Sequence, residues 1–105
     1  MKSQRKGADG ERELAELLRD RGYQITRGGS LSFGERPDLS GLPGVHVEVK
    51  RVERQNISEA MTQAVRDAER FQDGAPCVFH RRNRQPWLVT MRLEDWLALY
   101  ERSMT

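Results

Sequence analysis

Apolar residues recur with two different periods along this chain, and the change of period separates helices from strands. Residues 6–21 follow the three- and four-residue spacing of an amphipathic helix, which Gly22 ends. Strands are predicted next at residues 23–27, 36–40 and 45–51. The first half of the chain is therefore predicted to be one helix followed by three strands.

The second half of the chain changes from helix to strand and back to helix. Asn56 with Glu59 resembles a capping box at the start of a broad apolar stripe, which ends before Asp73-Gly74. Two more strands are predicted at residues 76–81 and 87–92. A last short helix carries the apolar residues Leu93, Trp96, Leu97 and Tyr100.

This order of elements predicts an α/β fold with a mixed five-stranded sheet flanked by helices. The helix between the strands at 45–51 and 76–81 suggests a parallel crossover, whereas turns join the earlier strands. The chain has 105 residues, of which 36% are hydrophobic and 32% charged, so it can build one core but not two. We therefore expect a single domain over residues 1–105.

The strand predicted at residues 45–51 divides its side chains between a core face and a charged face. Successive side chains of a strand point to opposite sides, so Glu48 and Lys50 project together. The turn at residues 41–44, Gly-Leu-Pro-Gly, folds Asp38 back alongside this strand. The opposite face is filled by Val45, Val47 and Val49.

Two acids and a lysine on adjacent strands fit the metal-dependent hydrolysis of phosphodiesters. Mg²⁺ prefers oxygen ligands and is usually held by one or two carboxylates together with phosphate and water. Asp38 and Glu48 would supply the carboxylates, and Lys50 would orient the attacking water and stabilise charge on the phosphate oxygens. The alternative is a surface strand with an ion pair on its solvent face, because Glu-Val-Lys alone is a weak motif.

A third acid, Glu11, lies on the apolar stripe of the first helix. It falls in line with Leu14, Ala15 and Leu18 at the spacing i, i+3, i+4 and i+7. A carboxylate buried beside leucines is costly unless it is paired or bound to a metal, which indicates a shared cation or a basic partner. Alternatively, Glu11 lies in the first turn of the helix, where an acid favours the macrodipole and stays solvated.

The net charge of +2 does not identify a nucleic-acid-binding protein, but the basic residues are clustered. Residues 81–92 contain several arginines and no acid. Such clusters fit contacts to phosphate, which position a duplex without reading its sequence. The same arginines could equally be solvated residues of a hairpin tip. The candidate DNA contacts from these clusters are Arg5, Lys6, Arg51, Arg54, Arg82 and Arg84.

No stretch of the sequence resembles a membrane span or a signal peptide. We therefore expect an intracellular, cytoplasmic protein without membrane contact. The single Cys77 lies in a predicted apolar strand, and it is interpreted as a small buried residue, not as part of a disulfide or a zinc site.

The motifs of residues 5–72 resemble, in order and spacing, the archaeal-type Holliday junction resolvases of the PD-(D/E)XK nuclease superfamily. The residues that carry the resemblance are Lys6-Gly7-Ala8, Glu11-Arg12-Glu13-Leu14, Gly22-Tyr23, Arg27 with Ser30, Asp38, and Glu48-Val49-Lys50. Residues 85–105 are more similar to small phage or prophage nucleases than to the archaeal resolvases, which implies a place in the host cytoplasm if a phage encodes the protein. The resemblance implies a restriction-endonuclease-like fold.

The resemblance also implies roles for individual residues. Asp38, Glu48 and Glu11 would bind Mg²⁺, or Mn²⁺ in its place, and together with Lys50 they would form the catalytic set. Gln63 borders the apolar stripe of the second long helix, where relatives sometimes place a glutamine near the metal; otherwise it is a boundary polar residue. The implied auxiliary residues near the scissile phosphate are Arg12, Arg27 and Ser30.

The activity implied by the resemblance is cleavage of branched DNA by a Holliday junction resolvase. The stripe with Trp96 and Tyr100 could pack on its own sheet or on a second subunit, and a homodimer would match the approximate two-fold symmetry of a four-way junction. Two alternatives stay open: a phage nicking or flap endonuclease of the same superfamily, and a catalytically inert DNA-binding module.

Overall fold

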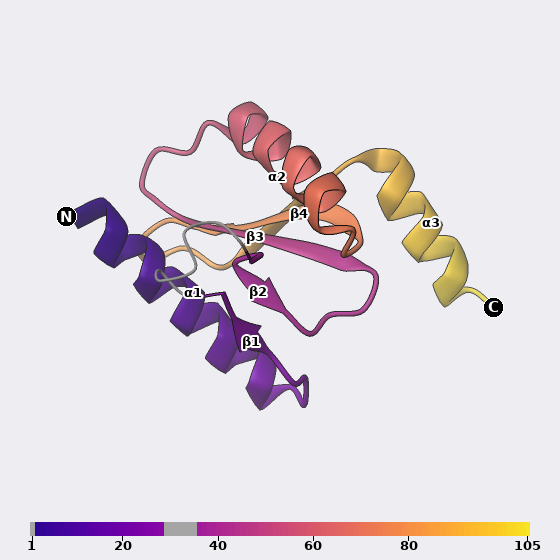
Figure 1. The fold of residues 1–105 in the computed structure, drawn as a ribbon, viewed down its shortest axis with the longest axis horizontal. Coiled ribbons are helices and arrows are strands. Elements are labelled where there is room, and N and C mark those ends of the chain that lie inside the picture. Colours follow the sequence, from indigo (N-terminus) through magenta and orange to yellow (C-terminus); the bar gives the residue numbers. More distant parts are fainter. Residues whose placement is uncertain (1, 29–35) are drawn as a thin grey trace.

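The computed structural model describes residues 2–28 and 36–105, and it describes side chains from residue 7 onward. Its helices and strands follow the predicted order (Figure 1). They are α1 (Lys2–Asp20), β1 (Thr26–Arg27), β2 (Leu39–Ser40), β3 (Val45–Arg51), α2 (Ile57–Phe71), β4 (Ala75–Arg81), β5 (Leu88–Met91) and α3 (Leu93–Ser103).

The first two strands are shorter than the sequence predicts, for reasons of backbone hydrogen bonding. The amide of Tyr23 donates to the carbonyl of Leu18 over 3.2 Å, so the chain is still tied to the end of α1 where a strand was expected. Strand β2 begins only after Pro37, which has no N–H to donate to a neighbouring strand. Strand β3 has the predicted bounds because its alternation of core and charged positions is long and regular.

The strands form one mixed sheet in the order β1-β2-β3-β4-β5. Strands β3 and β4 are parallel, as predicted, and the other neighbouring strands are antiparallel. Leu39 of β2 lies opposite Val47 of β3. In an antiparallel pair this register brings Asp38 level with Glu48, as the turn at residues 41–44 predicts.

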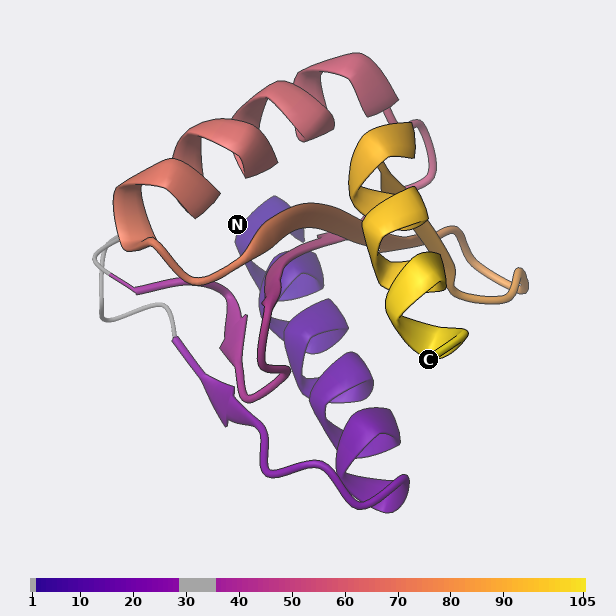
Figure 2. The ribbon, with the colours of Figure 1, turned by 90° about the vertical axis from the view of Figure 1, so that its right-hand side faces the viewer.

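Helices α1 and α2 cover opposite faces of the sheet (Figure 2). Leu14 and Ala15 of α1 pack against Leu39, Val47 and Val49, which confirms that the valine face of β3 belongs to the core. Gly10 allows this close approach, because a Cβ atom there would lie 2.5 Å from the Cβ of Arg51. The charged face of β3 therefore lies on the side of the sheet that α2 covers.

Small residues hold α2 against the other face of the sheet. Ala60 and Ala64 pack with Val78 of β4 in a second core cluster. The side chain of Asn56 caps the helix by accepting a hydrogen bond from the amide of Glu59 over 3.1 Å, as predicted. The row of alanines brings the backbone of α2 near the sheet, so the polar residues beside that row can reach the charged face of β3.

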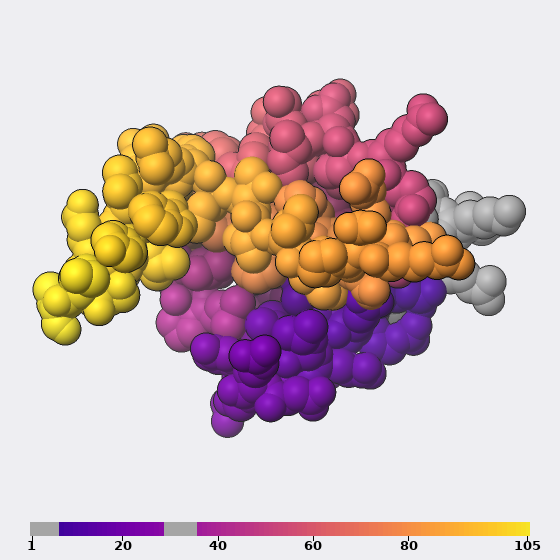
Figure 3. All heavy atoms as spheres, turned by 180° about the vertical axis from the view of Figure 1, so that it is seen from behind, coloured from indigo at the N-terminus to yellow at the C-terminus, as the bar shows by residue number. Residues whose placement is uncertain are grey.

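Helix α3 extends from one end of the molecule and has no buried residue (Figure 3). The large apolar side chains of this segment are 39–70% exposed. The opposite side of the helix carries Asp95, Ala98 and Arg102, which line a hollow together with Ala75 of β4. Five of these residues, along one side of α3 and at its C-terminal end, are named here the α3 stripe, and none belongs to either core cluster: Leu93, Trp96, Leu97, Tyr100 and Met104.

Cys77 is buried in β4, as predicted. Burial, reinforced by the nearby carboxylate of Asp95, raises the pKa of the Cys77 thiol to about 11. In the part of the chain that the structure describes, no helix is long and apolar enough to cross a membrane.

Candidate active site

Glu48 and Lys50 project from the same face of β3, as the alternation predicts, and Gln63 of α2 lies between them. The amide nitrogen of Gln63 donates to Oε2 of Glu48 over 2.9 Å. The amide oxygen of Gln63 accepts from Nζ of Lys50 over 2.8 Å. One side chain of α2 therefore fixes both charged groups of the strand.

Asp38 lies beside β3 and is bound to its backbone. Its Oδ2 atom accepts a hydrogen bond from the amide of Val49 over 2.8 Å. Burial, followed by the negative charge of Glu48, raises the pKa of Asp38 to about 7, and the Val49 hydrogen bond only partly opposes this. A buried carboxyl that another carboxylate keeps from ionising is typical of a functional site, and a bound cation would relieve the repulsion.

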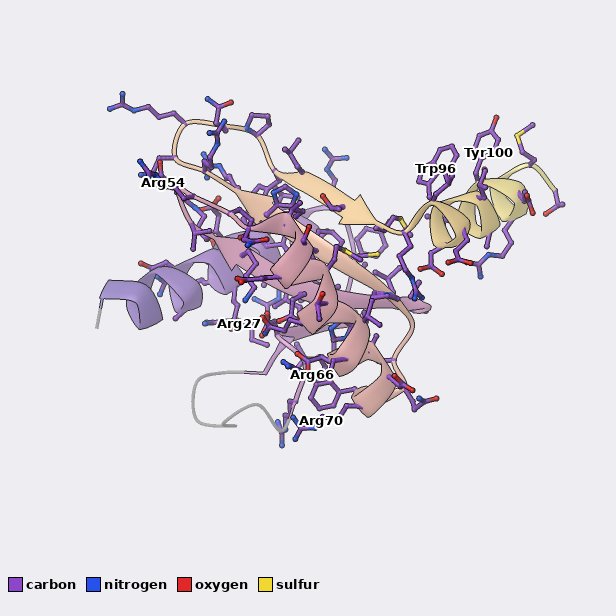
Figure 4. All side chains as sticks on the ribbon, turned by 90° about the horizontal axis from the view of Figure 1, so that it is seen from above. Arg27, Arg54, Arg66, Arg70, Trp96 and Tyr100 are labelled. Carbon is purple, nitrogen blue, oxygen red and sulfur yellow. The ribbon has the colours of Figure 1, made fainter. Side chains whose placement is uncertain are left out.

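Asp38 and Glu48 open into a common hollow of about 210 Å³. The floor is acidic, and the rim is basic. Arg66 and Arg70 are one helical turn apart on α2, and Figure 4 shows them on the same side of the molecule as Arg27, away from Arg54. The hollow is lined by Arg36, Pro37, Asp38, Glu48, Gln63, Arg66, Asp67, Arg70 and Phe71.

The donor set of this hollow fits a magnesium ion that takes only part of its ligands from the protein. Mg²⁺ commonly uses one or two carboxylates and completes its octahedron with water and phosphate, and Asp38 with Glu48 supplies such a pair. Within residues 2–28 and 36–105, no three His, Cys, Asp or Glu side chains converge closely enough to hold a metal ion unaided. The arrangement is therefore suited to an ion that DNA phosphate helps to bind.

Glu11 of α1 is half-buried near this site but does not line the hollow. Burial is the main cause that raises the pKa of Glu11; the positive charge of Arg27 opposes the rise, and the negative charge of Glu48 adds to it. Glu11 thus lies close enough to Arg27 and Glu48 for their charges to change its pKa, as expected for an inward-facing acid. Its role as a third metal ligand stays a prediction.

His46 belongs to the same charged face of β3, and the sequence interpretation missed it. The side chain is fully buried, with Nε2 at 3.1 Å from Oε1 of Glu48 and Nδ1 at 2.9 Å from Oδ1 of Asp73. Burial alone would lower the pKa of His46, but the hydrogen bonds to Glu48 and Asp73 outweigh it, so the pKa is raised. The two-residue spacing from Glu48 was the signal that could have identified His46.

Several residues predicted to bind DNA have partners inside the protein. Arg12 pairs with Asp9, next to it on α1. Arg27 donates to the carbonyl of Ala8 over 3.2 Å, while its buried Nε has no partner among the described residues. Arg51 pairs with Glu13 over 3.6 Å and also donates to Asn83. The DNA contacts predicted for these arginines stay predictions.

The remaining candidate DNA contacts lie elsewhere or cannot be placed. Arg54 and Arg82 line a separate hollow of about 580 Å³, and Arg84 lies in the turn before β5 with a φ of 62°. Ser30 falls outside the described residues, as do the side chains of Arg5 and Lys6. Two of the three arginines that line the acidic hollow, Arg66 and Arg70, were not singled out from the sequence, because they lie on the polar side of α2.

Comparison with known proteins gives one match along nearly the whole chain. The model of a family described as "Phage putative PDDEXK endonuclease" matches residues 2–105. A search of curated proteins found no match. The matched range contains Asp38, Glu48, Lys50 and Gln63.

Proposed function

Since the chain belongs to the family of phage putative PDDEXK endonucleases, we propose that it is a metal-dependent endodeoxyribonuclease that resolves Holliday junctions. The observation that carries the proposal is the pair of carboxylates, Asp38 and Glu48, in one hollow with a basic rim. Lys50 lies on the same strand face and is held by Gln63. Acids, lysine and arginines together fit the cleavage of a phosphodiester.

The acidic pair would hold Mg²⁺, or Mn²⁺ in its place. The bound cation would lower the pKa of a water molecule and neutralise charge on the scissile phosphate. Asp38 and Glu48 both line the hollow, and each carboxylate accepts a hydrogen bond that restrains it while keeping lone pairs free for a cation. Glu11 is proposed to support the same cation from α1.

Lys50 is proposed to act on the phosphate and on the attacking water. Its ammonium group is held 2.8 Å from the oxygen of Gln63, which leaves two of its three protons for other acceptors. A cation fixed in this way stabilises charge that develops on phosphate oxygens without having to reorganise. The proposed role of Gln63 is to hold the side chains of Lys50 and Glu48 in fixed positions relative to each other.

The rim arginines are proposed to position the DNA backbone. Arg66 and Arg70 project from α2, and Arg36 precedes Asp38 at the other side of the hollow. Guanidinium groups match the geometry of phosphate oxygens and read no sequence. Recognition would then depend on the shape of the DNA and the placement of its phosphates.

The α3 stripe supports a homodimer in which a second copy of this chain covers it. Its five side chains are 39–70% exposed and lie together, and a contiguous exposed apolar patch on a small protein often marks a site of protein–protein contact. A two-fold dimer would present one active site to each of two opposed strands of a four-way junction.

A panel of DNA substrates at fixed salt tests this proposal. Four-way junction, 5′ and 3′ flap, nicked duplex and linear duplex of shared sequence are incubated with Mg²⁺ and with Glu48→Gln as the inactive control. We expect the junction to be cut in preference to the others. Preference for a flap or nick would identify the alternative endonuclease, and no cleavage of any substrate would indicate an inert DNA-binding module.

A further inference from the structure

His46 connects the proposed cation ligand Glu48 to a second acid that lies outside the hollow. Each ring nitrogen faces a carboxylate: Nε2 is 3.1 Å from Glu48, and Nδ1 is 2.9 and 3.0 Å from the two oxygens of Asp73. The ring has no exposed surface, so both of its nitrogens depend on these carboxylates for their hydrogen bonds.

The end of α2 also fixes the plane of this ring. Phe71, the last residue of the helix, stacks on His46 with ring centres 6.3 Å apart and planes inclined by 16°. The guanidinium of Arg70 lies 4.9 Å from the centre of the Phe71 ring on the same helix. Asp73 follows after Gln72, whose left-handed conformation turns the chain back toward the sheet. Stacking and hydrogen bonds together leave His46 one orientation.

The consequence concerns Glu48, because His46 and Gln63 each hold one of its oxygens. Oε1 faces His46, and Oε2 accepts from Gln63. Each carboxylate oxygen keeps a second lone pair, so a cation can still bind. We propose that His46, anchored by Asp73, is a positioning residue that fixes the Glu48 carboxylate for a divalent cation. The proposal rests on the proposed function in one respect, the assignment of Glu48 as a cation ligand.

A purely structural role makes a different prediction. If the contacts from Asp73 to His46 and from His46 to Glu48 only join α2 to β3, their loss should lower the melting temperature and leave cation affinity unchanged. If they position Glu48, their loss should weaken cation binding, because groups that orient a metal ligand typically contribute about 10- to 100-fold in affinity. The two roles are therefore separated by measuring cation affinity and stability on the same variants.

Asp73 offers the sharper variant, because it reaches Glu48 only through His46 and does not line the hollow. Asp73→Ala removes the anchor, whereas Asp73→Asn keeps an oxygen that can accept from Nδ1. Glu69→Ala is the matched control, since Glu69 is an exposed acid of α2 that lines a different hollow. It controls for the loss of one negative charge at this end of the helix.

The experiment titrates each full-length variant with Mn²⁺ in a calorimeter without DNA, and records its melting temperature. We expect Asp73→Ala and His46→Gln to bind Mn²⁺ about 10- to 100-fold more weakly than wild type. Asp73→Asn should recover most of the affinity, and Glu69→Ala should match wild type. A variant that combines Asp73→Ala with His46→Gln should bind Mn²⁺ no more weakly than His46→Gln alone, because Asp73 acts through His46.

Folded Asp73→Ala and His46→Gln variants that bind Mn²⁺ as tightly as wild type would overturn the inference. So would a double variant in which the two losses of Mn²⁺ affinity add. A wild-type protein that binds no Mn²⁺ would overturn it as well. The proposed function fails separately: a wild type that binds Mn²⁺ but cuts no DNA contradicts the nuclease, while leaving the positioning role measurable. Cleavage by wild type together with unchanged affinity in the variants contradicts the positioning role alone.

Discussion

Lys50 donates a hydrogen bond from Nζ to the side-chain oxygen of Gln63 over 2.8 Å, which joins the charged face of β3 to α2. The contact explains why a lysine with a long flexible side chain has one position beside the acidic pair. Gln63 is uncharged, so the position of the Lys50 ammonium group depends on a neutral amide.

Replacing that amide should slow cleavage without much change in DNA affinity. In Gln63→Leu, Lys50 loses its acceptor and Glu48 loses a donor, so both groups shift from their positions. A displacement of about 1 Å can cost roughly 100-fold in rate, and we expect a loss of that order in kcat. Single-turnover cleavage and DNA binding in Ca²⁺ separate the two effects.

The neighbouring Thr62→Ala is the control for this substitution. Thr62 is exposed on α2 and donates its hydroxyl to the carbonyl of Ser58, away from the hollow. It should cleave at the wild-type rate. A Gln63→Leu variant that cleaves as fast as Thr62→Ala would show that the amide does not position Lys50.

The titration of Asp38 should make the metal-free protein less stable as the pH rises. The pKa of this carboxyl is raised from 3.8 to about 7 in the folded state, first by burial and then by Glu48. Between these two values the folded protein holds a proton that the unfolded chain has released, so stability falls as pH rises through this window. Above about pH 7 both states are ionised, and the loss is complete.

Melting temperatures in EDTA from pH 4.5 to 8 check this expectation. Asp38→Asn should remove that part of the decline, because an amide does not ionise. Asp20→Asn, at an exposed acid that ends α1, should follow wild type. Added Mg²⁺ should raise the wild-type melting temperature most at pH 8, where it binds the ionised site. Parallel curves for Asp38→Asn and wild type would contradict the assignment.

Arg66 and Arg70 should contribute to DNA binding through phosphate alone. Removing either side chain should weaken binding to all sequences alike and reduce the slope of log K against log salt by about one. Arg21→Ala, at an exposed arginine just after α1, provides the same charge change away from the hollow. Fluorescence titrations at several salt concentrations measure the slopes.

The same titrations decide between the two basic regions. If Arg82→Ala and Arg84→Ala change the slope as Arg66→Ala does, the duplex extends from the hollow to the turn before β5. If these two variants bind like wild type, the turn is solvated, which is the alternative interpretation of the cluster. An unchanged slope in both Arg66→Ala and Arg70→Ala would remove the rim from the DNA-binding surface.

The sequence predicts the charged face of β3 better than it predicts what surrounds that face. Glu48 and Lys50 were placed correctly because a period of two residues is a local property of a strand. His46 has the same period, but a histidine among valines gave no sign of its partner. Asp73 was interpreted only as the end of α2, since its contact with His46 depends on how the chain returns to the sheet. Contacts between elements cannot be deduced from either element alone.

The outward position of the α3 stripe illustrates the same limit. Leu93, Trp96, Leu97 and Tyr100 have the spacing of a core helix, and that spacing is identical for a helix that packs on a partner. In the structure the small and polar side of α3 faces β4 and the stripe is exposed, so packing of the stripe on its own sheet is not observed, and packing on a partner stays a proposal. The stacked pair of Trp96 and Tyr100, with ring centres 5.1 Å apart, remains exposed.

Loss of this pair should disrupt the proposed homodimer and leave each active site intact. Trp96→Glu with Tyr100→Lys places charges in the middle of the α3 stripe, where a second copy would have to bury them. We expect a dimer by sedimentation of wild type at micromolar concentration and a monomer for the double variant. Glu94→Lys with Arg102→Glu is the control, because both residues lie on α3 outside the stripe.

Cleavage products then test what the dimer is for. The monomeric variant should nick junction DNA without cutting two opposed strands in one encounter, because only one site would reach the junction. A dimer with one Glu48→Gln subunit should likewise make one nick. A wild type that sediments as a monomer and cuts linear duplex as readily as a junction would remove the resolvase assignment, while cleavage itself would still support an endonuclease.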